Sequence, residues 1–409
     1  MNVNKNTPDI RFSGFGGNWD KKKLAELVQP VSSYPLSRGV EVNEDTKYRY
    51  IHYGDIHRGK LKVIKSEKQL SNIHMGNYEL LEKGDLVVAD ASEDYEGIAN
   101  PCVLDYELQD KVVAGLHTIA MRPINIDPLY LYNLFHTDLF KSHGRFIGTG
   151  TKVFGISAKN LLRFESFVPE LNEQAAIGSF FQHIDETIAL SRRKHEKTKT
   201  LKNAFLSKMF PQPGKDKPEI RLKGFSGDWV EKQLGDLSTV QMCKRIFKHE
   251  TKETGQIPFY KIGTFGGVAD AYIETALYED YKKKYPYPQA SDILISASGT
   301  IGRLIIYSGE NAYYQDSNII WLNIDKLQLV NSFLFYFYQT VKWNKVEGST
   351  IKRLYNSDIL STSIKIPKIE EQAAIGQLFK QLDDTLALQA KQLKALESLK
   401  KALLAKMFV

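Results

Sequence analysis

Two stretches of the chain carry apolar residues at alternating steps of three and four, the spacing that lines one face of a long helix. Near the end of the sequence this stripe consists of Ile375, Phe379, Leu382, Leu386, Leu393, Leu396, Leu403 and Met407, with gaps at Gln389 and Lys400. The earlier stretch, which has a more polar middle, carries the same stripe at Ile177, Phe181, Ile184, Ile188, Leu201, Phe205 and Met209. Each stretch therefore predicts one long amphipathic helix.

Helices of this length need a partner for their apolar face. About 35 residues give a helix roughly 50 Å long, and a single helix cannot bury such a stripe alone. Two of them in one chain can bury each other, so we expect an antiparallel coiled coil that acts as a spacer. The alternative is that each stripe packs on its own globular domain.

The segments between the helices, about residues 20–165 and 230–363, have a different pattern. Short β-branched or apolar runs edged by Gly, Asp or Asn predict strands at residues 85–89, 111–113, 292–296 and 318–322. One buried helix is expected in each segment, at residues 129–135 and 332–338. The predicted fold class is α+β: two globular domains, at residues 1–165 and 213–364, and two long helices, at residues 166–212 and 365–409.

The sequence also repeats itself. The segment Asp9–Trp19 recurs as Glu219–Trp229 at an offset of 210 residues, and Pro169–Phe210 recurs as Pro367–Phe408 at an offset of 198. Between these markers only scattered echoes survive, such as residues 84–88 with 291–295 and 50–54 with 259–263. A plain duplication with uniform drift explains these echoes. It does not explain why the helix segments stayed nearly identical while the segments between the markers diverged. Two similar frames with dissimilar inserts, a pseudo-twofold internal repeat, predict one scaffold that presents two different recognition surfaces.

Composition narrows the class of protein. The chain has 409 residues, 42% of them hydrophobic, which is enough for two or three domains with their own cores. A formal charge of +7 is mild and favours a polyanionic partner. Cys102 and Cys243 have no cysteine neighbours, which excludes a disulfide scaffold. Without a signal-peptide core or an apolar run near 18 residues, we expect a cytoplasmic protein.

Motifs of the common enzyme sites are incomplete. Residues 12–16 have the F-x-G-x-G spelling of a methyl-donor loop, but the copy at residues 222–226 loses the last glycine. Residues 148–152 do not fit a P-loop, and the nine histidines show no metal-ligand spacing. We therefore expect no catalytic residue, no metal site and no cofactor in this chain.

Basic side chains recur in both inserts, interleaved with tyrosines around residues 278–287. Lysines neutralise phosphates, and tyrosines hydrogen-bond phosphates or stack on sugars and bases. Each run alone is more typical of a solvated surface, but the recurrence favours nucleic-acid contact. The candidates are Arg58, Lys60, Arg145, Lys244, Arg245, Lys282, Lys283, Lys284 and Tyr285.

Loops of glycine and small polar residues stand at comparable places in the two inserts. Residues 89–93 match 296–303, and residues 148–152 match 347–353. Glycine lets a backbone approach a groove closely, while polar side chains recognise base edges. For any single loop, a hairpin turn is an equally good interpretation. The candidates are Ser92, Thr149, Thr151, Lys152, Ser298, Thr300, Arg303, Ser349, Thr350, Lys352 and Arg353.

With these features the whole chain resembles a specificity subunit of a type I restriction–modification system. The resemblance rests on the glycine–tryptophan motifs that end at Trp19 and Trp229, on the Glu-Gln pairs that open the long helices, and on the duplication with divergent inserts. It implies that each insert is a target recognition domain for one half of a bipartite double-stranded DNA target. It also implies that the coiled coil sets the gap and docks two methylation subunits, with the candidate docking residues Glu173, Gln174, Glu371 and Gln372.

The resemblance further implies that the chain is not itself an enzyme. In such systems S-adenosylmethionine, Mg²⁺ and ATP belong to the methylation and restriction subunits, which methylate adenine and cut DNA. Two other functions remain open from the residues alone. One is a coiled-coil adaptor that binds only proteins, which lacks DNA affinity. The other is a self-contained methyltransferase or nuclease with drifted motifs, which would act on DNA without partners.

Overall fold

The computed structural model describes residues 6–92, 97–147, 154–212, 214–341, 343 and 353–409. The chain divides into two compact units. Unit 1 consists of residues 1–192 and 391–409, and unit 2 of residues 193–390. No helix in the described part of the chain is long and apolar enough to cross a membrane.

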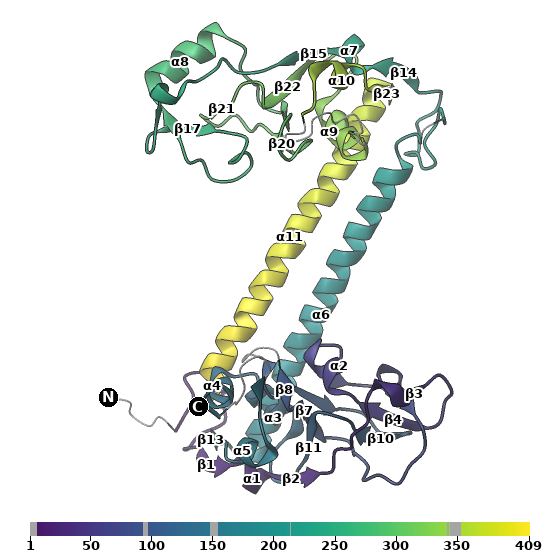
Figure 1. Ribbon diagram of the computed structural model, residues 1–409, viewed down its shortest axis with the longest axis vertical. Helices are drawn as coiled ribbons and strands as arrows, with labels where there is room; N and C mark the ends of the chain where they lie inside the picture. The colour runs from purple at the N-terminus through teal and green to yellow at the C-terminus, as the bar shows by residue number, and fades with distance from the viewer. Residues whose placement is uncertain (1–5, 93–96, 148–153, 213, 342, 344–352) are drawn as a thin grey trace. The chain divides into compact units, whose positions relative to one another are not determined.

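Unit 1 is built on short strands (Figure 1). These are β1 (Asp20–Lys23), β2 (Val28–Val31), β3 (Glu41–Val42), β4 (Tyr48–Ile51), β5 (Val63–Ile64), β6 (Ser71–Ile73), β7 (Leu86–Ala89), β8 (Ala91–Ser92), β9 (Pro101–Leu104), β10 (Lys111–Ala114), β11 (Thr118–Pro123), β12 (Phe154–Gly155) and β13 (Glu165–Val168). Its helices are α1 (Leu24–Leu27), α2 (Tyr53–His57), α3 (Pro128–Leu134), α4 (Asp138–Ile147) and α5 (Ala158–Leu161).

Unit 2 has the same kind of architecture. Its strands are β14 (Val230–Gln233), β15 (Ser238–Gln241), β16 (Thr251–Lys252), β17 (Ile257–Tyr260), β18 (Tyr272–Ile273), β19 (Ile293–Ser296), β20 (Leu304–Ile306), β21 (Tyr313–Tyr314), β22 (Ile319–Ile324) and β23 (Ser363–Ile366). Its helices are α7 (Leu234–Leu237), α8 (Thr275–Lys284), α9 (Asn331–Thr340) and α10 (Asn356–Leu360). Both units share the two long helices α6 (Leu171–Lys208) and α11 (Ile369–Met407).

The two units repeat one strand order. The sheet β2-β11-β7-β9 of unit 1 has its counterpart in β15-β22-β19-β20 of unit 2, and β10-β4-β6-β3 corresponds to β21-β17-β18-β16. Even the one parallel pair of the second sheet recurs, as β10 with β4 and β21 with β17. The four predicted strands correspond to β7, β10, β19 and β22, and the two predicted helices correspond to α3 and α9. The α+β fold class is therefore confirmed. The inserts are therefore alike in topology although their sequences have diverged.

Each unit buries one end of each long helix. In unit 1, Phe181 near the start of α6 and Phe408 just after α11 lie with their ring centroids 5.8 Å apart, and Tyr130 is 5.0 Å from Phe408. In unit 2, Phe379 and Phe210 take the corresponding places, 6.2 Å apart. We call these two groups of rings the aromatic sockets. Each long helix thus starts in the core of its own half of the sequence and ends in the core of the other half.

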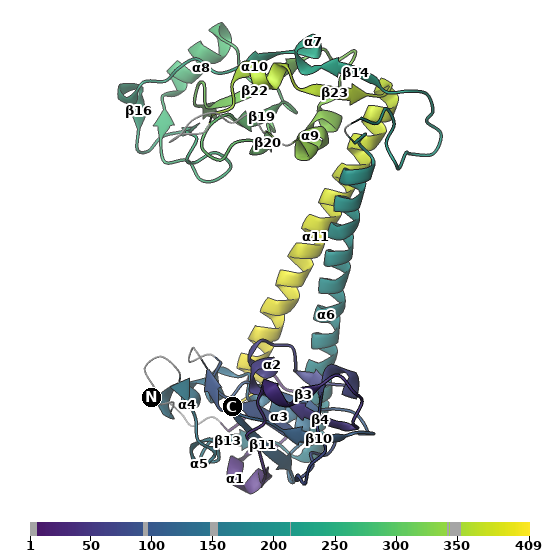
Figure 2. The same ribbon diagram turned by 45° about the vertical axis from the view of Figure 1, so that its right-hand side comes forward.

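Within each unit the two long helices run side by side in opposite directions (Figures 1 and 2). In unit 1, Lys400 donates to Asp185 at 2.6 Å, and in unit 2, Lys202 donates to Asp383 at 2.6 Å. These two ion pairs are the same pair repeated at the offset of 198 residues. The predicted antiparallel pairing is confirmed. The alternative, in which each stripe packs on its own globular domain, describes only the first turns of each helix.

One residue of the predicted stripe was placed wrongly. Leu201 is 45% exposed, and the neighbouring Lys202 lies in the seam instead. The reason is that Lys202 is partly buried by its ion pair with Asp383, while its ammonium group lies 5.5 Å from the centre of the Tyr336 ring. A lysine with such partners can occupy a position that the apolar pattern alone assigns to leucine.

The start of each long helix is fixed by a buried ion pair. Two nitrogens of the Arg11 guanidinium donate to the two oxygens of Glu173, each at 2.7 Å, and Arg221 binds Glu371 in the same way. The carboxylates are almost wholly buried, whereas the arginines also bind the carbonyls of the glycine-rich turns, such as Gly17 and Gly227. The repeated segment at the beginning of each half therefore clamps the helix of its own half.

We predict that Arg221→Met lowers the free energy of unfolding of unit 2 by about 3–5 kcal/mol, because it leaves the Glu371 carboxylate buried without its partner. The double variant Arg221→Met/Glu371→Met should recover most of this loss. Urea unfolding followed by tryptophan fluorescence measures the difference. Arg245→Met, which breaks an exposed pair with Asp316, is the matched control and should cost less than about 1 kcal/mol. A loss for Arg221→Met as small as that of the control would contradict the prediction.

Candidate nucleic-acid interface

Three loops meet at one end of the central sheet in unit 2. The first follows β19, the second precedes β22, and the third leads into α10. The Ala297 amide donates to the Asn318 carbonyl at 2.8 Å, and the Leu354 amide donates to the Ala297 carbonyl at 2.8 Å. A β-bridge between Ser298 and Arg353 joins the first loop to the third.

Unit 1 repeats this arrangement bond for bond. The Asp90 amide donates to the His117 carbonyl at 3.1 Å, and the Ile156 amide donates to the Asp90 carbonyl at 2.8 Å. Strand β8 pairs with β12 where unit 2 has its single bridge. We call these loops the three-loop edge, which comprises residues 90–92, 115–118 and 154–156 in unit 1 and residues 297–303, 315–318 and 353–354 in unit 2. In unit 2 the described parts of the two polar loops that the sequence matched therefore meet, whereas in unit 1 the predicted loop at residues 148–152 lies outside the described residues.

The loop between β21 and β22 is held rigidly from several sides. Arg245 binds Asp316 at 2.9 Å, Arg353 donates to the Ser317 carbonyl at 3.2 Å, and the Ser298 hydroxyl donates to Asn318 Oδ1 at 2.7 Å. Ser317 has a φ of 59°, a left-handed conformation that costs a non-glycine residue free energy. Two predicted contact residues, Arg245 and Arg353, thus flank this loop and fix its shape.

Beside the loop lies a hollow of about 650 Å³ with a lining of mixed charge, in which Arg245 and Lys261 are paired with Asp316 and Asp270. Arg245, Lys248, Lys252 and Lys261 contribute to its wall, together with Asp316 and Asn318 from the three-loop edge and the acidic Glu253 and Asp270. Cations around a concave surface attract phosphates. The hollow extends the three-loop edge of unit 2 with a charged surface that contains these four cations.

The lysines and tyrosine predicted around α8 lie on a tyrosine-rich surface. Lys282 donates to the Tyr278 hydroxyl at 2.9 Å, and this hydrogen bond raises the pKa of Lys282. Lys244 lies 5.1 Å from the ring centre of Tyr285, and Lys284 binds Asp280 at 2.7 Å. Lys283 is exposed. This group therefore combines charge with aromatic faces, as the sequence suggested.

The remaining candidates are scattered. Arg58 and Lys60, at the end of α2, lie 3.8 and 3.6 Å from Asp55, and Arg145 on α4 donates to Ser142. Ser92 is buried in β8, and Ser298 is buried and donates to Asn318. Arg303 donates to the Phe265 carbonyl. Thr300 is exposed in the first loop of unit 2. Outside the described residues lie Thr149, Thr151, Lys152, Ser349, Thr350 and Lys352. Whether any of these residues contacts nucleic acid stays a prediction.

The four predicted docking residues are bonded inside their own units. Glu173 and Glu371 bind the arginines described above. The Gln174 side chain accepts from the Asp127 amide and donates to the Pro169 carbonyl, and Gln372 bonds in the same way to Val330 and Pro367. All four side chains are at most 2% exposed. The structure assigns them an internal role, and docking by them stays a prediction.

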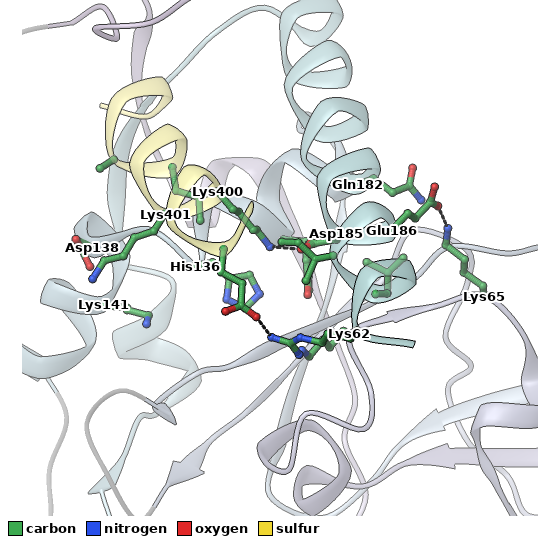
Figure 3. Close-up of a pocket in the computed structure, with 18 residues that line it drawn as sticks. Lys62, Lys65, His136, Asp138, Lys141, Gln182, Asp185, Glu186, Lys400 and Lys401 are labelled. Atoms are coloured by element: carbon green, nitrogen blue, oxygen red, sulfur yellow. Dashed lines mark hydrogen bonds and ion pairs between the residues drawn. The ribbon is translucent and has the colours of Figure 1, made fainter. Parts of the chain in front are cut away.

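A second hollow, of about 950 Å³, lies in unit 1 between the long helices and the globular core (Figure 3). Its wall mixes charges, with ion pairs between Lys400 and Asp185 and between Lys65 and Glu186. His136 lies close to the first of these pairs, and burial together with Lys400, Lys141 and Lys62 lowers its pKa to about 3. In the described part of the chain, no group of three or more His, Cys, Asp or Glu residues is placed to hold a metal ion.

His117, Gln315 and Asn318 lie on the three-loop edge, although the sequence analysis did not select them. The His117 ring is half exposed, with Nδ1 3.3 Å from Asp90 Oδ1, and burial raises the pKa of that carboxyl. Gln315 accepts a bond from the Ile262 amide at 2.9 Å. The signal that finds these residues is the match between residues 84–88 and 291–295, which identifies β7 with β19 and hence the neighbouring loops.

The chain matches known proteins along its length. A family model described as the type I restriction modification DNA specificity domain matches residues 16–200 and 226–398. A putative type I restriction enzyme specificity subunit of Haemophilus influenzae is 54% identical over 143 residues, which are 35% of this chain and 37% of that relative. The putative MjaX specificity subunit of Methanocaldococcus jannaschii is 22% identical over 95% of this chain and 92% of its own length.

Solved structures share the fold. The S subunit of a type I restriction–modification system from M. genitalium has a TM-score of 0.62 at 17% identity, over 98% of this chain and 99% of that one. A chain from a study of complex assembly and conformational transition of the type I R-M system has a TM-score of 0.52 at 17% identity, over 94% and 96% of the two chains. At such identities the likeness concerns the fold alone.

We predict that acid destabilises unit 1 through His136. Its pKa of about 3 in the folded chain lies below the ordinary value of about 6.5, so the unfolded chain binds the extra proton first. Stability is therefore lost as the pH falls below about 6.5, by about 1–3 kcal/mol between pH 7.5 and 4.5. His136→Gln should remove this part of the loss in urea unfolding at several pH values. His183→Gln, on the exposed face of α6, is the control and should behave as the wild type. Equal pH dependence of His136→Gln and wild type would contradict the prediction.

Proposed function

Because the chain belongs to the type I restriction–modification DNA specificity family, we propose that it selects the DNA sequence on which a type I restriction–modification complex acts. Each unit recognises one half of a bipartite double-stranded target. The observation that carries the proposal is the three-loop edge. It has one backbone arrangement in both units, but its side chains differ between them.

Recognition divides into positioning and selection. Cations such as Arg245, Lys252 and Lys283 contact phosphates, which places a unit on the duplex without sequence preference. Side chains of the three-loop edge contact base edges and supply the preference. Since the edges of the two units differ chemically, the two half-sites differ in sequence.

The long helices supply the gap between the half-sites. In each unit they are locked in one register by the same repeated ion pair, Asp185 with Lys400 and Asp383 with Lys202. A helix of fixed length with fixed partners joins the two readers, so the number of base pairs between the half-sites is set by helix length.

In this proposal the chemistry belongs to partner subunits. Two methylation subunits dock on the frame that the repeated segments form, and restriction subunits join the complex. S-adenosylmethionine, Mg²⁺ and ATP are bound by these partners. Methylation of adenine requires that the base leave the stack, which is the work of a methylation subunit while this chain holds the duplex in place.

The experiment is to change the gap without changing the readers. One heptad is inserted into α6 after Arg192 and one into α11 after Ala390, which keeps the seam continuous in both helices. Seven residues lengthen a helix by about 10 Å, or about three base pairs of duplex. The motif methylated by the complex should keep both half-sites and gain about three base pairs between them.

The control is the wild-type chain with the same partners, tested on its target duplex and on a duplex of shuffled sequence. Equal binding of the two duplexes by the wild-type complex would refute the proposed function. An unchanged gap in the heptad variant would refute the role of the helices.

A further inference from the structure

His117 in unit 1 and Asn318 in unit 2 occupy the same position of the repeated fold. The backbone carbonyl of each accepts from the residue that follows the central strand, Asp90 or Ala297. The carbonyl of that residue in turn accepts from Ile156 or Leu354, which are separated by the repeat offset of 198. Both residues immediately precede the strand that pairs with the central one, β11 or β22.

The two side chains are oriented by neighbours that differ between the units. His117 Nδ1 lies 3.3 Å from Asp90 Oδ1, and its ring packs edge-on against Tyr53 with centroids 5.3 Å apart. Asn318 Oδ1 accepts from the Ser298 hydroxyl at 2.7 Å. Asn318 Oδ1 is thus hydrogen-bonded within the protein and His117 Nδ1 faces the Asp90 carboxyl, while the second polar atom of each side chain is left over. Among the described residues, neither His117 Nε2 nor Asn318 Nδ2 makes a hydrogen bond.

The atoms left over differ in hydrogen-bonding character. An imidazole nitrogen such as His117 Nε2 accepts or donates a hydrogen bond according to the tautomer of the ring. Asn318 Nδ2 can only donate. In the major groove, adenine N6 and cytosine N4 are donors, whereas the purine N7, guanine O6 and thymine O4 are acceptors. An imidazole nitrogen and an amide donor at the same place in two readers select different bases.

We propose that His117 and Asn318 are specificity-determining residues that each contact one base edge, at corresponding positions of the two half-sites. His117 hydrogen-bonds a base edge through Nε2, and Asn318 donates to a base acceptor. This inference rests on the proposed function and adds to it the residues that make the half-sites unlike.

The loops that carry the two residues are held in place by the protein itself. The loop around Asn318 is fixed before DNA arrives, by Arg245 on Asp316 and by Arg353 on the Ser317 carbonyl. In unit 1 the Gly115 and Leu116 amides bond to the carbonyls of Ile51 and Leu36. Little conformational freedom is lost on binding, so a neutral hydrogen bond at this place contributes fully to discrimination.

Two conservative variants test the proposal in the full chain with its methylation partners. Asn318→Asp keeps the oxygen that accepts from Ser298 and removes the Nδ2 donor. His117→Asn keeps a nitrogen near Asp90 and removes Nε2, and asparagine tolerates the left-handed φ of 55° at this position. The readout is the base preference at every position of the target, measured by binding to duplex libraries randomised in one half-site at a time.

Each variant should lose preference at one base position of one half-site, by roughly 5- to 150-fold, and keep the other half-site unchanged. Lys283→Gln is the matched control: an exposed cation on α8 whose loss weakens binding to all sequences alike. A variant whose preference equals that of the wild type at every position, or one that only weakens binding uniformly as the control does, would overturn the assignment of that residue. Absence of any preference in the wild type would instead contradict the proposed function.

Discussion

The exchange of helix ends between the two halves of the sequence is the interaction on which the rest of the structure depends. Phe408, encoded at the end of the second half, completes the core of unit 1, and Phe210, from the end of the first half, completes that of unit 2. Burying one such ring stabilises a core by about 2–3 kcal/mol. Neither half can form its aromatic socket alone. Both repeats must therefore keep the same helix, which explains why the helices are nearly identical and the inserts are not.

A frame closed in this way leaves the loops free to vary. The buried strands β7 and β19 need only apolar side chains of suitable size, and both have them. The loops at their ends share backbone hydrogen bonds, such as Asp90 to His117 and Ala297 to Asn318, which do not depend on the side chains. The side-chain bonds that fix each loop further, such as Arg245 with Asp316 in unit 2, differ between the units. One architecture therefore carries two chemically unlike edges.

Local periodicity revealed most of the fold, because the long helices and the buried strands are defined by spacing along the chain. Leu201 was misplaced because the seam there is held by Lys202 and Asp383, which are distant in sequence. The ion pairs of Glu173 and Glu371 were not predicted for the same reason, because a charged residue is expected to be exposed until its partner is known. His117 and Asn318 lie in loops, where no periodic pattern marks a position. The match of residues 84–88 with 291–295 relates β7 to β19, and the pairing of these strands with β11 and β22 then shows that the two residues are equivalent.

The central claim is that two independent readers share one frame, and exchange of one insert tests it most directly. Residues 20–165 are replaced by the corresponding insert of another member of the family, and the methylated motif is determined by sequencing the DNA of cells that make the chimaera with its partners. The account predicts a motif with one new half-site, while the other half-site and the gap stay as in the wild type. A motif in which both half-sites change, or neither does, would contradict it.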